Sequence, residues 1–138
     1  FSYFGILSEG SAGAVVDVTE RSGIIAYYFQ FAISLSLVHS LFEEYYWRWF
    51  VFGGLRRSLS FSKAAVISSV GFSLHHFVIL SAFVSWPLVL LFGISVGVAG
   101  YFWCWLYERE HSIIPLWISH AFADMVIMLI GWLLISSL

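Results

Sequence analysis

Three short clusters of ionisable side chains lie inside otherwise apolar stretches of this sequence, and catalysis or ligand binding is most expected there. Two adjacent glutamates, with an arginine four residues after the second, occur in the segment LFEEYYWRWF, residues 41–50. Two adjacent histidines end the segment FSLHH, residues 72–76, and a histidine with an aspartate four residues later occurs in HAFAD, residues 120–124. These residue types act as general bases, proton carriers and metal ligands. The candidates are Glu43, Glu44, Arg48, His75, His76, His120 and Asp124.

The composition is typical of a membrane protein. Of the 138 residues, 61% are hydrophobic and only 10% are charged, whereas about a quarter of the residues in soluble domains are charged. The formal net charge is −2, and the six Lys and Arg residues form no basic stripe, so no nucleic-acid partner is expected. Cys104 is the sole cysteine, which excludes an intramolecular disulfide.

Four long apolar stretches predict four transmembrane helices. Each is longer than the about 20 residues that a helix needs to cross the hydrocarbon core, and a helix satisfies its own backbone hydrogen bonds there. The predicted fold class is therefore all-α, a polytopic membrane helix bundle. We expect residues 1–23 to be an N-terminal juxtamembrane segment, truncated upstream because no initiator methionine is present, and residues 24–138 to form the core. The predicted helices run approximately over residues 24–52, 63–84, 86–107 and 113–136.

The basic residues predict how this bundle is oriented. The loop after the first helix contains Arg56 and Arg57, the loop after the third contains Arg109, and the turn between the second and third contains no basic residue. Cytoplasmic loops are enriched in Lys and Arg. We therefore expect a multi-pass integral membrane protein whose first and third loops are cytoplasmic.

Helical rise places the polar residues of three helices at a similar depth in the membrane. Glu43 lies about 15 Å from the cytoplasmic end of its helix, and His76 lies about 20 Å from the same side. His120 and Asp124 lie about 10 and 16 Å from it. A charge at the bilayer centre costs on the order of 3 kcal/mol, and such residues normally face one another inside the bundle. The shared depth predicts a single site.

Spacing along each helix suggests partners within this site. Glu44 and Arg48 are four residues apart with the acid first, which is the favourable order for a helical ion pair. Glu43 is rotated by about 100° from Glu44, so the two carboxylates need not share a role. For the same reason we expect at most one of His75 and His76 to point directly at the site, and we assign His75 a supporting position.

Taken together, the three clusters resemble the motifs of a known enzyme family. EEYYWR, FSLHH and HAFAD are similar to the EExxxR, FxxxH and HxxxN or HxxxD motifs of the CPBP family of intramembrane endopeptidases. That family includes CAAX prenyl proteases and bacteriocin-processing, Abi-like proteins. The resemblance covers roughly residues 35–132 of this chain.

The resemblance implies an intramembrane endopeptidase that hydrolyses a peptide bond of a membrane-associated peptide or protein. Glu43, helped by His76, would activate water, and His120 with Asp124 would stabilise the oxyanion. Asp124 stands where the family more often has asparagine, and an ionised aspartate cannot donate a hydrogen bond. Asp124 is therefore either protonated, or orients His120, or ligates a metal. The supporting residues would be Glu44, Arg48, Phe72 and His75.

A metal-dependent reaction is an open alternative. Glu43, His76, His120 and Asp124 form a suitable zinc ligand set, but the sequence has no HExxH motif, and we favour a reaction without metal or other cofactor. Two other classes also remain open, a proton- or metal-handling membrane protein and a catalytically silent membrane scaffold or immunity protein. The expected partners are the lipid bilayer and a membrane-bound peptide or protein substrate.

Overall fold

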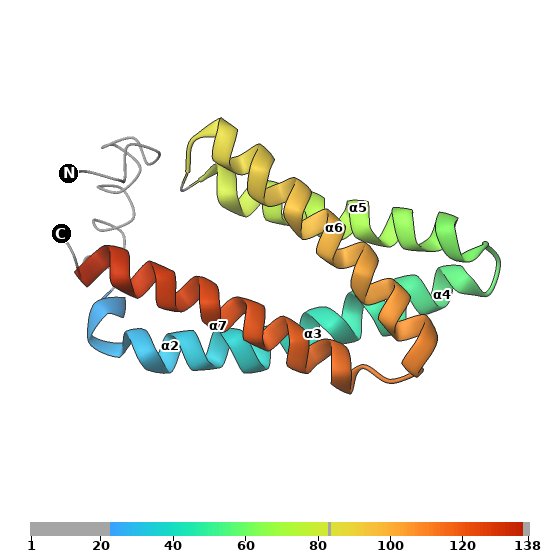
Figure 1. Ribbon diagram of the computed structural model, residues 1–138, viewed down its shortest axis with the longest axis horizontal. Helices are drawn as coiled ribbons and strands as arrows, with labels where there is room; N and C mark the ends of the chain where they lie inside the picture. Colours follow the sequence, from blue (N-terminus) through green and yellow to red (C-terminus); the bar gives the residue numbers. More distant parts are fainter. Residues whose placement is uncertain (1–22, 83, 137–138) are drawn as a thin grey trace.

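The computed structural model describes residues 23–82 and 84–136 and is helical throughout its regular elements, with no strand in those ranges. Four of its helices are long and apolar enough to cross a membrane (Figure 1). The predicted all-α polytopic class is therefore confirmed. The predicted N-terminal segment, apart from Gly23, lies outside the described residues. The four spans are Ile25–Arg56, Phe61–Ser81, Trp86–Glu110 and Ile114–Leu133.

The first span is not a uniform α-helix. After a 3-10 turn, η1 (Ile24–Tyr27), it is built from α2 (Tyr28–Ser34), η2 (Leu35–His39), α3 (Ser40–Glu44), η3 (Tyr45–Phe52) and α4 (Gly53–Arg56). Both η2 and η3 are π-helical. π-helical turns are rare and occur frequently at functional sites. The short segment α3, which carries both glutamates, lies between the two.

Helices α5 (Phe61–Ser81) and α6 (Trp86–Glu110) form a closely packed hairpin. Gly93 lies so close to the ring of Phe77 that a Cβ at this position would collide with it. The Ser73 hydroxyl donates a hydrogen bond of 2.6 Å to the Gly93 carbonyl, and Gly97 lies against the same serine. Small residues that allow close backbone approach are typical of transmembrane helix packing.

Two helices continue further than the sequence predicted, and α5 ends earlier, at Ser81 instead of residue 84. The first span continues through Gly53 to Arg56, and α6 continues to Glu110, so the predicted loops 53–62 and 108–112 are shorter than expected. Hydropathy marks where the lipid-embedded part ends, but a helix can continue into water with charged residues on its surface. A left-handed His111 (φ 50°) follows α6, and Pro115 lies in the first turn of α7 (Ile114–Ser136). Both are ordinary features of helix ends.

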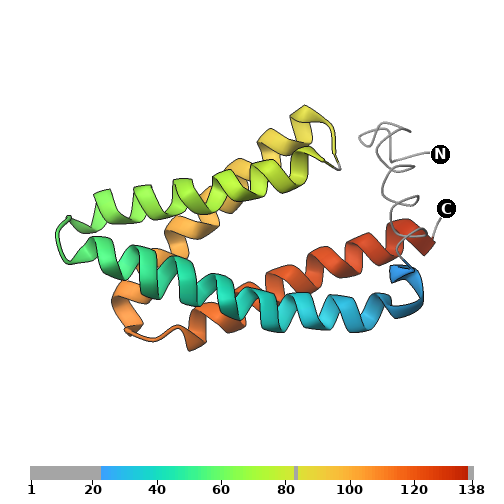
Figure 2. The same cartoon turned by 180° about the vertical axis from the view of Figure 1, so that it is seen from behind.

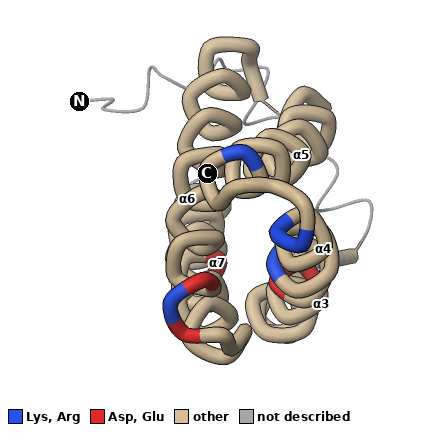
Figure 3. Tube along the Cα trace, turned by 90° about the vertical axis from the view of Figure 1, so that its right-hand side faces the viewer, with Lys and Arg blue, Asp and Glu red and all other residues tan. Residues whose placement is uncertain are grey.

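The α4–α5 loop and the α6–α7 loop lie at the same end of the molecule (Figures 1 and 2). Arg56 Nε donates to both carboxylate oxygens of Glu108, at 3.1 and 3.0 Å, and so connects the end of α4 to the last turns of α6 beside these loops. Viewed from that end, most charged positions lie at these loops and most of the tube is uncharged (Figure 3). The predicted common end of the first and third loops is confirmed, and the side of the membrane that it faces stays a prediction.

Large apolar side chains cover the outside of the bundle, while the tightly packed interior is small. One buried cluster joins Phe52, Ala64, Ala65 and Cys104, and a second joins Phe72, Trp103 and Leu116. A helix that is apolar all round suits either a protein interior or a lipid environment. The exposed apolar side chains include Phe42, Val78, Leu91, Val98, Phe122 and Ile127.

Candidate active site

The two glutamates of α3 are both buried but face different neighbours. Glu43 is 8% exposed and Glu44 is fully buried. Glu43 lies toward α5, where its Oε1 is 2.8 Å from Nε2 of His75. Glu44 lies toward η3, where its Oε1 is 3.1 Å from Nη1 of Arg48. The expected division between the two carboxylates is therefore visible in their contacts.

Arg48 is held in the interior by charge and by aromatic faces. Its guanidinium carbon lies 4.2 Å from the ring centroid of Phe72 and 5.0 Å from that of Trp103. Cation–π contacts at such distances are favourable. Among the described residues, no acceptor has hydrogen-bonding geometry toward the guanidinium nitrogens, so the attraction to Glu44 is a close ion pair rather than a directed hydrogen bond. The predicted Glu44–Arg48 pair is confirmed, and Phe72 supports it.

His120 on α7 connects both glutamates. Its Nδ1 lies 2.6 Å from Oε1 of Glu44, and its Nε2 lies 3.5 Å from Oε2 of Glu43. An ionised carboxylate only accepts hydrogen bonds, so Nδ1 carries a proton and Nε2 is directed toward Glu43. Asp124 Oδ1 lies 3.7 Å from the same Nε2, and the imidazole stacks on Trp103 with ring centroids 4.2 Å apart.

His75 lies closer to Glu43 than the sequence suggested. The expectation that at most one of His75 and His76 points at the site is wrong. One ring nitrogen of each histidine and a carboxylate oxygen of Glu43 lie within 4.8 Å of one another. The two Cβ atoms diverge around α5, but the long side chains converge again, with ring centroids 4.0 Å apart. Glu43 therefore meets both rings.

His76 is oriented by the backbone of its own helix. Its Nδ1 lies 3.0 Å from the Phe72 carbonyl oxygen, four residues earlier. A carbonyl oxygen can only accept, so Nδ1 donates and a neutral His76 keeps a free lone pair on Nε2. The Phe72 ring also contacts His76, with centroids 4.7 Å apart. Phe72 thus positions the histidine that follows it in the predicted motif.

The rim of the site contains two further titratable groups. His39, one turn before Glu43, places Nδ1 3.6 Å from Oε2 of that glutamate, and its side chain is 53% exposed. The side chain of Asp124 is 16% exposed. The structure thus brings all four predicted catalytic residues together, and the buried carboxylate of Glu43 lies next to a side that is open to its surroundings.

A comparison with protein-family models identifies the chain. Residues 25–126 match the family described as type II CAAX prenyl endopeptidase, Rce1-like. The chain belongs to this family. The match contains every predicted site residue, and it confirms the resemblance to CPBP endopeptidases. No curated protein and no solved structure matches the chain.

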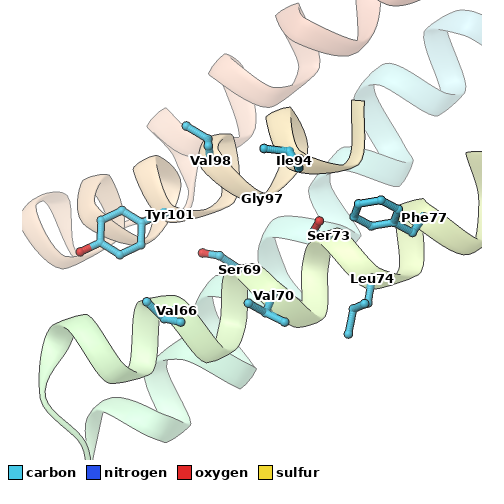
Figure 4. A pocket seen from close by; sticks show the side chains of 10 residues that line it. All are labelled: Val66, Ser69, Val70, Ser73, Leu74, Phe77, Ile94, Gly97, Val98 and Tyr101. Atoms are coloured by element: carbon cyan, nitrogen blue, oxygen red, sulfur yellow. The ribbon is translucent and has the colours of Figure 1, made fainter. Parts of the chain in front are cut away.

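This Rce1-like site does not coincide with the apolar groove between α5 and α6. The groove has a volume of about 560 Å³, and none of the eight predicted site residues lines it (Figure 4). Its walls are apolar side chains such as Val66, Val70, Ile94 and Val98. The chemistry is therefore concentrated where α3, α5 and α7 meet rather than in this groove.

The side chains of the Rce1-like site have two chemical capacities. Glu43 and the surrounding histidines can move protons, because carboxylate and imidazole are ordinary general bases and acids. They also include metal-ligand types. The cluster whose ligand atoms lie within 4.8 Å of one another contains Glu43, His75 and His76. It includes His75 in place of the predicted ligands His120 and Asp124.

Proposed function

We propose that this protein is an intramembrane endopeptidase that hydrolyses a peptide bond of a membrane-associated substrate, with a CAAX-type prenylated tail as the first substrate to test. One observation carries the proposal. The carboxylate of Glu43, inside a transmembrane bundle, lies 2.8 Å from His75 and 3.5 Å from His120. A buried carboxylate with imidazoles on two sides is suited to water activation, and the Rce1-like membership supports a protease.

Glu43 acts as the general base in this proposal. It takes a proton from water while the oxygen attacks the substrate carbonyl carbon. Nε2 of His76 accepts a hydrogen bond from the second O–H of the water, since its Nδ1 donates to the Phe72 carbonyl. His75 donates to Oε1 of Glu43 and leaves Oε2 for the water. General-base catalysis of this kind contributes about 10²–10⁴-fold to a rate.

His120 stabilises the negative charge that develops on the substrate oxygen. Its Nδ1–H is engaged by Glu44, so donation to the oxyanion requires a proton on Nε2 as well. Carboxylate oxygens of Glu43 and Asp124 lie 3.5 and 3.7 Å from that nitrogen, and their negative charge favours a proton there. Preorganised donors aimed at developing charge are a large source of rate enhancement. Arg48 lies 3.1 Å from Glu44 and holds that carboxylate in place beside His120.

Hydrolysis is completed without a covalent enzyme intermediate. The proton held by Glu43 passes to the amide nitrogen, the C–N bond breaks, and the oxygen of water stays on the new carboxyl group. One peptide and one water give one acid and one amine. Glu43 returns to its carboxylate form, so no cofactor is consumed.

Cleavage of defined peptides by the reconstituted protein tests this proposal. Wild-type protein in liposomes, with a chelator present, is incubated with a farnesylated CAAX peptide and with its unprenylated form, and the products are identified by mass spectrometry. We expect one internal cleavage of the farnesylated peptide and none with Glu43→Gln. Absence of cleavage of any membrane-anchored peptide by a folded wild-type protein would reject the endopeptidase proposal.

A further inference from the structure

The two π-helical segments on either side of α3 each accept a hydrogen bond from a neighbouring helix. In η2, the Leu37 carbonyl accepts from Nε1 of Trp117 on α7, at 2.8 Å. In η3, the Trp47 carbonyl accepts from the hydroxyl of Ser68 on α5, at 3.0 Å. Among the residues that the structure describes, these are the two side-chain hydrogen bonds that other helices donate to the backbone of the first span. Both therefore reach that span in a π-helical segment.

A backbone carbonyl in such a segment needs a partner inside the protein. A π-helical turn replaces the i→i−4 hydrogen bonds of an α-helix by i→i−5 bonds, so backbone groups change partners where the turn begins and ends. The hydrocarbon core supplies no water, and side chains of neighbouring helices satisfy backbone groups that a helix frees there. Ser68 is fully buried and offers a hydroxyl donor, and the Trp117 indole offers an N–H. The two hydrogen bonds therefore stabilise the π-helical register.

Trp117 connects the segment before α3 to the histidine of α7. It precedes His120 by three residues, and residues with this spacing lie on the same side of a helix. The side of α7 that brings His120 to within 2.6 Å of Glu44 thus also holds the Leu37 carbonyl. The carbonyl lies six residues before Glu43. The start of α3 and its histidine partner are therefore fixed to one surface.

Ser68 connects the segment after α3 to the histidine beside Glu43. Its hydroxyl fixes the backbone of Trp47, and the Trp47 ring lies so close to α5 that a Cβ at Gly71 would be 2.8 Å from it. The His75 imidazole stacks on the same indole, with an interplanar angle of 6° and centroids 5.6 Å apart. Nε2 of His75 then lies 2.8 Å from Oε1 of Glu43. The hydrogen bond of Ser68 thus reaches Glu43 through one indole and one imidazole.

We propose that Ser68 and Trp117 are positioning residues that hold α3 at the rotation at which Glu43 and Glu44 meet the histidines. α3 has only five residues, little more than one turn, so the segments on its two sides determine its orientation. Return of one π-helical turn to α-helical bonding would shift the register by one residue, a rotation of about 100°. Such a rotation would move both carboxylates away from their partners. The effect on cleavage rests on the proposed function, whereas the positioning of the glutamates does not.

NMR of the histidine ring nitrogens measures the positioning without a substrate. The chain has five histidines, and the shift of each ring nitrogen depends on its hydrogen bond. Protein labelled with ¹⁵N-histidine is compared in one detergent as wild type, Ser68→Ala and Trp117→Phe, after circular dichroism has shown that each is folded. We expect the Nε2 resonance of His75 to move in Ser68→Ala and the resonances of His120 to move in Trp117→Phe. The exposed His111 should be unchanged in both.

Two matched controls remove the same chemical groups elsewhere. Ser73→Ala removes another serine hydroxyl of α5 that donates to a backbone carbonyl, but the acceptor is Gly93 on α6 instead of the first span. Trp105→Phe removes the indole N–H of an exposed tryptophan on α6. Both variants should keep the resonances of the site histidines at their wild-type positions. A resonance that stays unmoved in Ser68→Ala or in Trp117→Phe would overturn the positioning role of that residue.

Single-turnover cleavage then measures the effect on the proposed reaction. At a saturating concentration of membrane-anchored peptide, we expect a rate at least about tenfold lower in Ser68→Ala and in Trp117→Phe, since misplacement of a reacting group by about 1 Å can cost 10²-fold. The half-saturating peptide concentration should stay within twofold of wild type, as should the rates of Ser73→Ala and Trp105→Phe. Moved resonances with a wild-type rate would overturn the catalytic part of the proposal. If the wild type cleaves no peptide, the proposed function fails and the NMR comparison alone decides the positioning.

Discussion

Replacement of Arg48 by methionine should destabilise the bundle strongly. Arg48 and Glu44 are 1% and 0% exposed and 3.1 Å apart, and removal of one partner of a buried ion pair costs about 3–5 kcal/mol. The lost cation–π contacts add about 0.5–2 kcal/mol each, and methionine recovers about 0.3–1.5 kcal/mol against the same rings. The remaining hydrogen bond from His120 to Glu44 offsets part of the loss. We expect a decrease of at least about 3 kcal/mol in the free energy of unfolding.

A double-mutant cycle tests whether the loss comes from the uncompensated carboxylate. Unfolding in mixed micelles of increasing SDS content is followed by far-UV circular dichroism for Arg48→Met, Glu44→Gln and the double variant. The double variant should recover about 2 kcal/mol relative to the sum of the single variants, within the range for residues in contact. Arg109→Met, at a side chain that is 67% exposed, is the control. A loss below about 1 kcal/mol in Arg48→Met, or strict additivity, would refute the reasoning.

Three further predictions follow from the packing and the site. Gly93→Ala should lower the free energy of unfolding by about 1–3 kcal/mol in the same assay, because its new Cβ would collide with the Phe77 ring. Gly54→Ala is the control and should not lower it, because nothing lies within 4 Å of the new Cβ. Asp124→Asn should lower the cleavage rate less than tenfold, since Asn keeps a polar side chain of the same shape beside Nε2 of His120. A loss above 100-fold would assign Asp124 a direct proton-transfer role. Exhaustive chelation should leave the cleavage rate within twofold of its starting value, and loss of activity restored by added zinc would contradict the metal-free mechanism.

The fold could be predicted from the sequence because lipid imposes a simple rule. A span must be apolar and about 20 residues long, so the four helices follow from hydropathy alone. The ion pair of Glu44 and Arg48 followed from i,i+4 spacing, and the meeting of Glu43 with His120 followed from their similar depth in the membrane. The spacing of residues along each helix and the rise per residue are enough to predict these features, without knowledge of how the helices pack.

The remaining features depend on tertiary geometry. The contact of His120 with Glu44 requires the rotation of α7 about its axis, which an apolar surface on all sides of the helix does not specify. The π-helical segments on both sides of α3 change the helical register relative to a regular α-helix, and no residue in them signals this. His75 was assigned a supporting position because the angle between neighbours on a helix is about 100°. Side-chain length, rather than backbone angle, brings it to Glu43.

The single-turnover cleavage rate of Glu43→Gln tests the central claim most directly. Glu43→Gln preserves the shape of the side chain but removes the base, and Glu110→Gln makes the same change at an exposed position. With both variants folded and saturated with the same membrane-anchored peptide, we expect a loss of at least about 100-fold for Glu43→Gln. Glu110→Gln should remain within twofold of the wild type. A Glu43→Gln rate above one tenth of the wild-type rate would contradict the assignment of Glu43 as the general base.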